Sequence, residues 1–378
     1  VVERVEQAER ETRHGLFRVP TLTETLARRG RSVVALSSNS PGSTRLIFHR
    51  AGDVGGINIP VNGVEHALPQ KLREELFGDR RSEKPSEPDL AGLREINRLY
   101  RLLTAGSRMP DLSILWYGEP DHAYHAFGID APESREALQT ADACFGEILD
   151  EYANDDVQIV VAYDHGHITV REHFDLAEAL VQAGFKKGVT LADREADFVL
   201  LWGYSGNIYV SNRELIPAIC HELMGMPEVG MLFTRDRDGI HGVVDGTFST
   251  RLVAGDSDRA GDIRFILRSE TDGTCICAAP IGIGCGIHGG LHPHEISCLL
   301  GFGGTAFRDK TVVDTVTGAI DITPTLYELM GIQPDILPQG RVLNEVLATP
   351  AATGSDEIIE PLRRDFQTGR NGFLQQLT

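Results

Sequence analysis

Three short stretches of this 378-residue sequence combine carboxylates and imidazoles at spacings that suit a metal ion. The first carries Asp121 and His125, which are four residues apart, so one helical turn or a tight loop lets both reach one ion. The second carries the adjacent pair Asp164 and His165, and the third carries His288 among glycines. Carboxylate oxygen and imidazole nitrogen together suit Zn²⁺ or Mn²⁺. We therefore predict that three distant segments form one divalent-metal site.

Other residues beside these stretches have supporting roles in this interpretation. Gly166 directly follows the Asp-His pair and permits a tight turn without the steric penalty of a Cβ atom. Glu119 is expected to orient a ligand or a turn rather than to act as a catalytic acid. Three histidines adjoin the candidate ligands, and we predict that they contact substrate: His122, His167 and His292.

The elements that must position these side chains follow from hydrophobic patterning. Residues 111–117 and 157–163 are apolar runs, and residues 134–152 between them have helical spacing. The order strand, helix, strand indicates an α/β fold. Because the two strands are almost continuously apolar, we expect a parallel sheet that is covered on both faces. Ligands of such sheets bind beyond the carboxyl ends of the strands. Both acidic stretches lie at such ends.

Further elements are expected before and after this region. Thr21 and Glu24 form a capping-box pattern that starts a helix, which should end at Gly30 and lead into a buried strand over 32–37. We also expect two helices, over residues 93–103 and 321–331. Short strands over 198–202, 208–210 and 263–267 and a helix over 213–223 fall in a region rich in glycine and charge.

The change of composition in that region predicts four parts. These are a first part of the α/β core (1–187), an inserted or peripheral lobe (188–274), a second part of the core (275–349) and a C-terminal tail (350–378).

Composition limits the partners and the compartment. Thirty-six Lys and Arg against 55 Asp and Glu give a formal charge of −19, which repels nucleic-acid polymers and anionic lipid. Apolar runs stop short of the roughly 18 residues of a membrane helix. We predict a small phosphate ester or nucleotide as substrate, with no nucleic-acid polymer and no membrane as partner. None of the six cysteines forms a C-x-x-C pair, and free buried thiols slightly favour the cytoplasm. Compartment and oligomeric state stay open.

The order E-P-D-x-x-x-H at 119–125, D-H-G at 164–166 and H-G at 288–289 resembles the alkaline phosphatase superfamily, and most closely its type I phosphodiesterase / nucleotide pyrophosphatase branch. The resemblance covers most of residues 15–335. It implies a three-layer α/β/α sandwich with a mostly parallel sheet and an inserted smaller lobe. It also implies two divalent ions, with zinc expected and manganese as the alternative. Asp121, His125 and His288 would hold one ion, and Asp164 with His165 would hold the other.

The resemblance further implies hydrolysis of phosphodiester or pyrophosphate bonds through a covalent phospho-Thr or phospho-Ser intermediate. In the family, a metal-binding Asp and the nucleophile normally precede the segment that Pro20–Leu22 resembles, and here only about 19 residues precede it. We therefore expect an N-terminally truncated fragment without its nucleophile, which could be inactive alone. The sequence also departs from the family pattern at Tyr124, where a small residue is usual, and at His167, where Met is frequent.

Two alternatives remain open at this point. The chain could have another activity of the superfamily, such as that of a phosphoglycerate mutase-like enzyme or a phosphonate hydrolase. The sulfatase motif C-x-P-x-R is absent from the sequence, which lowers that option. The second alternative is a non-catalytic, metal-binding remnant or pseudoenzyme.

Overall fold

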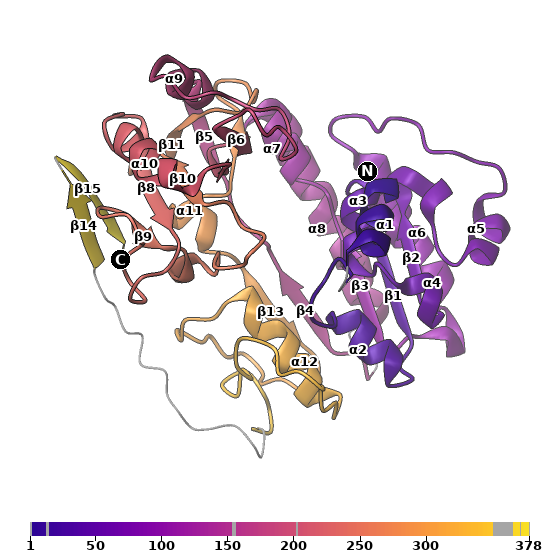
Figure 1. Cartoon of the computed structure of the whole chain (residues 1–378). Helices are drawn as coiled ribbons and strands as arrows, with labels where there is room; N and C mark the ends of the chain where they lie inside the picture. The colour runs from indigo at the N-terminus through magenta and orange to yellow at the C-terminus, as the bar shows by residue number, and fades with distance from the viewer. Residues whose placement is uncertain are drawn as a thin grey trace. The chain divides into compact units, whose positions relative to one another are not determined.

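The computed structural model describes residues 2–12, 15–152, 156–201, 203–350, 366–370 and 372–377. Its internal contacts divide the chain into two compact units (Figure 1). The first unit contains residues 1–123, 130–162 and 299–360, and the second contains residues 124–129, 163–298 and 361–378. The four-part division proposed from composition draws its boundaries at other residues and stays a prediction.

A parallel sheet of order β2-β1-β3 forms the centre of the first unit. Its strands are β1 (Val33–Ser37), β2 (Ile57–Pro60) and β3 (Leu112–Trp116). All five residues of β1 are buried, as its near-continuous apolar sequence requires between two parallel neighbours. The run predicted over 157–163 forms β4 (Ile159–Ala162), which pairs with β13 (Leu300–Gly303) in the antiparallel direction.

Helices cover this sheet on both faces: α2 (Leu22–Arg28), α6 (Leu90–Thr104), α8 (Pro132–Tyr152) and α12 (Ile322–Leu329). Alternate residues of β1 enter two separate apolar clusters, because successive side chains of a strand point to opposite faces. Val34 and Leu36 pack with residues of α6 and α8, whereas Val33 and Ala35 pack with residues of α2 and α12. The unit is therefore a three-layer α/β/α arrangement.

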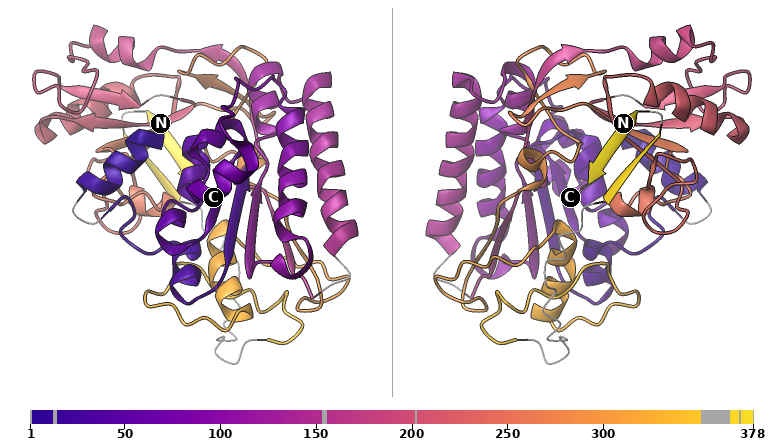
Figure 2. Two further views of the ribbon diagram at one scale, coloured as in Figure 1. Left: turned by 90° about the vertical axis from the view of Figure 1, so that its right-hand side faces the viewer. Right: turned by 90° about the vertical axis from the view of Figure 1, so that its left-hand side faces the viewer.

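The two long helices α6 and α8 lie side by side on one face of this sheet (Figure 2). The buried Asn97 amide of α6 donates to the Cys144 carbonyl of α8 at 2.5 Å, and its oxygen accepts the Tyr117 hydroxyl at 2.6 Å. Helix α6 begins three residues before the predicted start, because the Asp89 carboxylate caps it by accepting the Gly92 amide.

The helix predicted at Thr21 is confirmed as α2, and its capping box is present. Gly331, two residues after α12, has a φ of +62°, the left-handed conformation typical of glycine after a helix. The remaining helical segments of this unit are α1 (Val2–Glu11), α3 (Pro41–Ile47), α4 (Ala51–Val54) and α5 (Gln70–Phe77), with the 3₁₀ turns η1 (Val61–His66), η2 (Gly106–Arg108) and η5 (Ala319–Asp321).

The second unit contains a five-stranded sheet of order β6-β7-β10-β8-β9. Its strands are β6 (Phe198–Leu201), β7 (Ser205–Val210), β8 (Val229–Thr234), β9 (Phe248–Ser249) and β10 (Ile263–Leu267). Neighbours are antiparallel except β8 and β9. The predicted bounds of β10 are confirmed. Trp202, the predicted last residue of β6, lies outside the described residues.

A smaller sheet of the same unit carries residues of the candidate site. It has the order β11-β5-β12, with β5 (Ile168–His173) between β11 (Thr274–Cys277) and β12 (Gly286–Ile287). Strand β11 runs parallel to β5, and β12 runs antiparallel to it. The helical segments of this unit are α9 (Leu176–Gln182), η3 (Arg213–Leu215), α10 (Ile216–Met224), η4 (Thr250–Val253) and α11 (Pro293–Ile296).

The chain ends in a hairpin of β14 (Phe366–Arg370) and β15 (Phe373–Leu377) that belongs to the second unit. The buried Gln375 amide makes three hydrogen bonds, two to Leu232 of strand β8 and one to Gly246. Its oxygen accepts the Leu232 amide at 2.9 Å, and its nitrogen donates to the Leu232 carbonyl at 3.2 Å and to the Gly246 carbonyl at 2.6 Å.

All six cysteines are free. Four are buried and two are half-buried: Cys144, Cys220, Cys275 and Cys277, then Cys285 and Cys298. None of the helices in the described part of the chain combines the length and the apolar character that crossing a lipid bilayer demands.

Candidate metal centre

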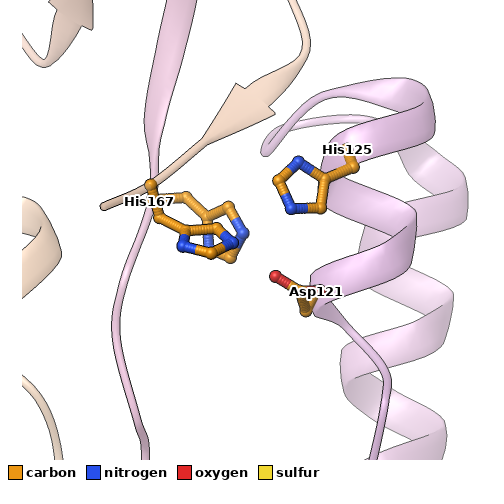
Figure 3. Close-up of side chains that lie close together, drawn as sticks. Asp121, His125 and His167 are labelled. Carbon is orange, nitrogen blue, oxygen red and sulfur yellow. The ribbon is translucent and has the colours of Figure 1, made fainter. Parts of the chain in front are cut away.

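Helix α7 (Asp121–Phe127) carries the first two candidate ligands. It follows β3 after a four-residue connection and begins in the first unit and ends in the second. One continuous helical turn fixes Asp121 relative to His125, and both side chains point toward His167 (Figure 3). Asp121, His125, His167 and His288 each offer one ligand atom, and these four atoms all lie within 4.8 Å of one another.

Strand pairing brings two of these histidines together. His167 directly precedes β5, and His288 directly follows β12. The antiparallel register pairs Ile168 with Ile287, so the next step along the ladder places His167 opposite His288. Their ring centroids are 5.1 Å apart, and each lies close to the ring of His125, at 5.3 Å from His167 and 5.0 Å from His288.

Strand β12 also orients His125, through Gly286. The Nδ1 atom of His125 lies 2.8 Å from the carbonyl oxygen of Gly286. A carbonyl oxygen can only accept, so Nδ1 carries the hydrogen and the neutral ring presents its Nε2 lone pair. Histidine ligands of metals commonly fix their tautomer through such a backbone contact. His125 is therefore prepared to bind an ion through Nε2.

Asp164 and His165 follow β4 after one intervening residue, Tyr163, and belong to the second unit. The Oδ2 atom of Asp164 lies 3.5 Å from Nε2 of His165, and the Asp164 side chain is 58% exposed. The Nδ1 atom of His165 lies 3.3 Å from the Gly166 carbonyl, which again makes Nδ1 the donor. The His165 ring stacks on the ring of His288, with centroids 3.6 Å apart and planes inclined by 13°. The structure therefore brings His165 next to the four-residue cluster.

Gly166 is required for a reason that differs from the predicted one. Its φ lies outside the left-handed region, so the turn itself does not demand glycine. A Cβ atom at this position would lie 2.0 Å from the carbonyl oxygen of His294. The Gly166 amide donates to the Glu295 carbonyl at 2.8 Å. Close approach of these two backbone segments explains the glycine of the D-H-G stretch.

Glu119 holds the start of α7. Its carboxylate is buried and accepts the Asp89 amide at 2.8 Å and the Ala123 amide at 2.9 Å. Ala123 lies between Asp121 and His125 in the first turn of the helix. Burial raises the pKa of Glu119, and the two backbone donors oppose that shift. Glu119 thus orients the turn that carries Asp121 and His125, as expected, whereas the absence of an acid-catalytic role stays a prediction.

Glu295 has a similar role for the loop after His288, a role that was not predicted from the sequence. Its buried carboxylate accepts the Gly290 amide at 2.8 Å and the His292 amide at 3.2 Å. Burial raises the pKa of Glu295, against the effect of these donors and of His165. A carboxylate three residues after an N-cap position is the available sequence signal, but histidine at the N-cap conceals it.

The three histidines predicted to contact substrate have different surroundings. His167 lies within the ligand cluster. His122 faces Glu119, with Nδ1 4.0 Å from the carboxylate. His292 caps α11 by accepting the His294 amide on Nδ1, and burial lowers its pKa. Substrate contact by any of them stays a prediction.

Comparisons with known proteins identify the family of this chain. A family model described as type I phosphodiesterase / nucleotide pyrophosphatase matches residues 16–271. The human ectonucleotide pyrophosphatase/phosphodiesterase family member 7 is 32% identical over 96 residues. That segment is 24% of this chain and only 20% of the length of the human relative.

Solved structures show the same fold. Murine ectonucleotide pyrophosphatase / phosphodiesterase 5 matches with a TM-score of 0.55 and 16% identity, over 86% of this chain and 74% of the murine chain. An inactive variant of that protein, solved in complex with AMP, matches equally well, and the human protein has a TM-score of 0.54 at 15% identity, over 87% of this chain and 75% of its own. The predicted α/β fold of alkaline phosphatase type is confirmed. Since the family model matches well over half of its residues, the chain belongs to the type I phosphodiesterase / nucleotide pyrophosphatase family.

Proposed function

We propose that this chain binds two divalent metal ions and hydrolyses a phosphodiester or pyrophosphate bond of a small phosphate ester. The observation that carries the proposal is the convergence of Asp121, His125 and His288, whose ligand atoms lie within 4.8 Å of one another. Family membership supports the same reaction class. A nucleotide is the substrate that we favour, because a murine protein of similar fold was solved in complex with AMP.

The donor set at the first site fits zinc. Two imidazoles and one carboxylate are ligands that zinc prefers, with manganese as the alternative. A tetrahedral ion with ligand distances of about 2.1 Å has ligand atoms about 3.4 Å apart. Atoms that already lie within 4.8 Å need only small side-chain rotations to reach this spacing. Asp121, His125 and His288 would hold the first ion.

The adjacent pair fits a second ion. The 3.5 Å between Oδ2 of Asp164 and Nε2 of His165 nearly equals the ligand spacing of about 3.4 Å that tetrahedral zinc requires. The backbone carbonyl of Gly166 fixes the tautomer that leaves Nε2 without hydrogen. Asp164 and His165 would hold the second ion.

When bound, such a pair of ions neutralises charge on the phosphoryl group and lowers the pKa of a nucleophile. The residues of this chain hold the ligands in place. Glu119 anchors the helix turn that carries Asp121 and His125, and Glu295 anchors the loop that follows His288. The family reaction through a covalent phospho-Thr or phospho-Ser belongs to this proposal, and we assign no nucleophile within the described residues.

The test combines metal content with turnover. The protein is expected to bind two equivalents of zinc and to hydrolyse a p-nitrophenyl phosphodiester. Asp164→Ala and His288→Ala should each lose zinc and turnover, whereas His173→Ala, an exposed imidazole at the end of β5, should keep both. Equal turnover by all three variants would reject the proposal. Zinc binding without any turnover would favour the non-catalytic alternative, in which the chain binds metal but does not hydrolyse the substrate.

A further inference from the structure

We propose that His167 is a fourth protein ligand of the ion that Asp121, His125 and His288 would hold. This inference rests on the proposed function and deepens it. With His167 included, the ion would have three nitrogen ligands and one oxygen ligand from the protein. The coordination of a tetrahedral ion would then be complete without water or substrate.

The geometry of the cluster supports equal membership for all four residues. The His167 ring lies 5.3 Å from that of His125 and 5.1 Å from that of His288, distances that match the 5.0 Å between those two rings. The ligand atom of His167 satisfies the same limit of 4.8 Å as the others. The widest pair would have to close by only about 1.4 Å to reach tetrahedral spacing.

The surroundings of His167 hold its ring in place. Strand register ties it to His288, because Ile168 pairs with Ile287. The Tyr124 ring packs against it edge to face, with centroids 4.9 Å apart and planes inclined by 69°. Gly286 leaves room beside both rings, since a Cβ atom there would lie 3.1 Å from the Tyr124 Cβ and 3.2 Å from the His167 Cδ2. The ring is thus supported from two elements besides its own strand.

A site with four protein ligands has a consequence for the two ions. Structural zinc sites are closed by four protein ligands, whereas catalytic sites keep one position open. The first ion would therefore be retained firmly and would contact the phosphoryl group only by expanding to five ligands. The ion of Asp164 and His165, whose carboxylate is 58% exposed, would be the more open of the two toward substrate.

Zinc affinity and zinc coordination test this inference without measuring turnover. The background is the whole chain with Asp164→Ala, which removes a ligand of the second ion. In that background, His167→Ala and His167→Gln should weaken zinc binding at least about tenfold in competition with a chelating dye. X-ray absorption of the zinc-loaded parent should give about four N/O ligands at about 2.0–2.1 Å. The cobalt-substituted parent should show the intense visible bands of a tetrahedral ion.

The control variants are His173→Ala, at an exposed imidazole of the same strand, and Asp121→Ala. Circular dichroism without metal verifies that each variant folds, and the glutamine variant replaces the alanine variant if the latter does not. If both His167 variants bind zinc as tightly as His173→Ala while Asp121→Ala does not, His167 is no ligand and the proposed function stands. If Asp121→Ala also binds zinc normally, the proposed metal site itself is wrong.

Discussion

The imidazole rings of His165 and His288 stack face to face, with centroids 3.6 Å apart and planes only 13° from parallel. His165 lies just before β5 and His288 just after β12, at the same end of the smaller sheet of the second unit, and the two residues are proposed to bind different ions. Each ring is therefore part of the packing that orients the other. A substitution of one of these two histidines should therefore also alter zinc affinity at the proposed site of the other.

We predict that His165→Ala weakens zinc binding at the site of Asp121, His125 and His288 by roughly tenfold, as loss of other supporting contacts around metal ligands does. A double-mutant cycle with His288→Ala measures the coupling through chelator competition. His173→Ala is the control, because His173 is an exposed imidazole at the opposite end of β5 from His165. Additive effects of the two stacked residues would show that the stacking does not couple the sites.

A second prediction concerns the glycine of the D-H-G stretch. Gly166→Ala should destabilise the protein by about 1–3 kcal/mol, a usual range for overpacking, because the added methyl group would meet a backbone carbonyl at 2.0 Å. Gly146→Ala is the matched control in α8, where an added Cβ meets nothing within 4 Å, and it should stabilise the helix by about 0.5–1 kcal/mol. Urea denaturation compares the two. Equal stability of both variants would contradict the close approach of Gly166 and His294.

A third prediction concerns Asp111, which links the starts of β1 and β3. Its Oδ2 atom accepts the Ser32 amide and the Ser32 hydroxyl, each at 2.8 Å, and its Oδ1 atom accepts from Arg31 at 3.0 Å. The Ser32 amide and hydroxyl, followed by Arg31, hold the pKa of Asp111 below its usual 3.8. Stability from this carboxylate is therefore present above pH 3.8 and is lost as the pH falls through the lower, folded-state pKa.

Asp111→Asn should consequently lower the free energy of unfolding by about 1 kcal/mol at neutral pH, a value kept small because the carboxylate is partly exposed. The difference from the parent should shrink at pH values well below 3.8. Denaturation at both pH values measures it, with Asp309→Asn, an 85% exposed carboxylate beside Lys310, as the control. If the difference in unfolding free energy between the variant and the parent did not depend on pH, the ionised form of Asp111 would make no contribution to stability.

The elements with strong local signals were predictable from the sequence. The capping box at Thr21 and Glu24 and the mostly apolar run Ile263–Leu267 specify their structures through neighbouring residues alone. The direction of β4 was not predictable, because its partner β13 lies more than 130 residues later and its apolar run fits either direction. Local pattern therefore determined where elements begin and end, and long-range pairing determined how they join.

The candidate site shows the same limit. Asp121 and His125 are four residues apart in one helix, so their proximity can be predicted from the sequence alone. The position of His167 beside His288 depends on the register of β5 against the two-residue strand β12, which has no pattern of its own. For this reason the sequence suggested a substrate contact at His167, whereas the fold places its ring among the candidate ligands.

The buried amide of Gln375 bonds to both the N–H and the C=O of Leu232 in β8. Strand β9 pairs only with Phe233 and Thr234 of β8, so Gln375 occupies backbone groups of β8 that β9 leaves open and that an incoming strand of another molecule would need. The hairpin that carries Gln375 thereby protects the sheet against edge-to-edge association between copies of the protein. Removal of this hairpin would expose the N–H and C=O groups of Leu232, which could then pair with a strand of another molecule and cause aggregation.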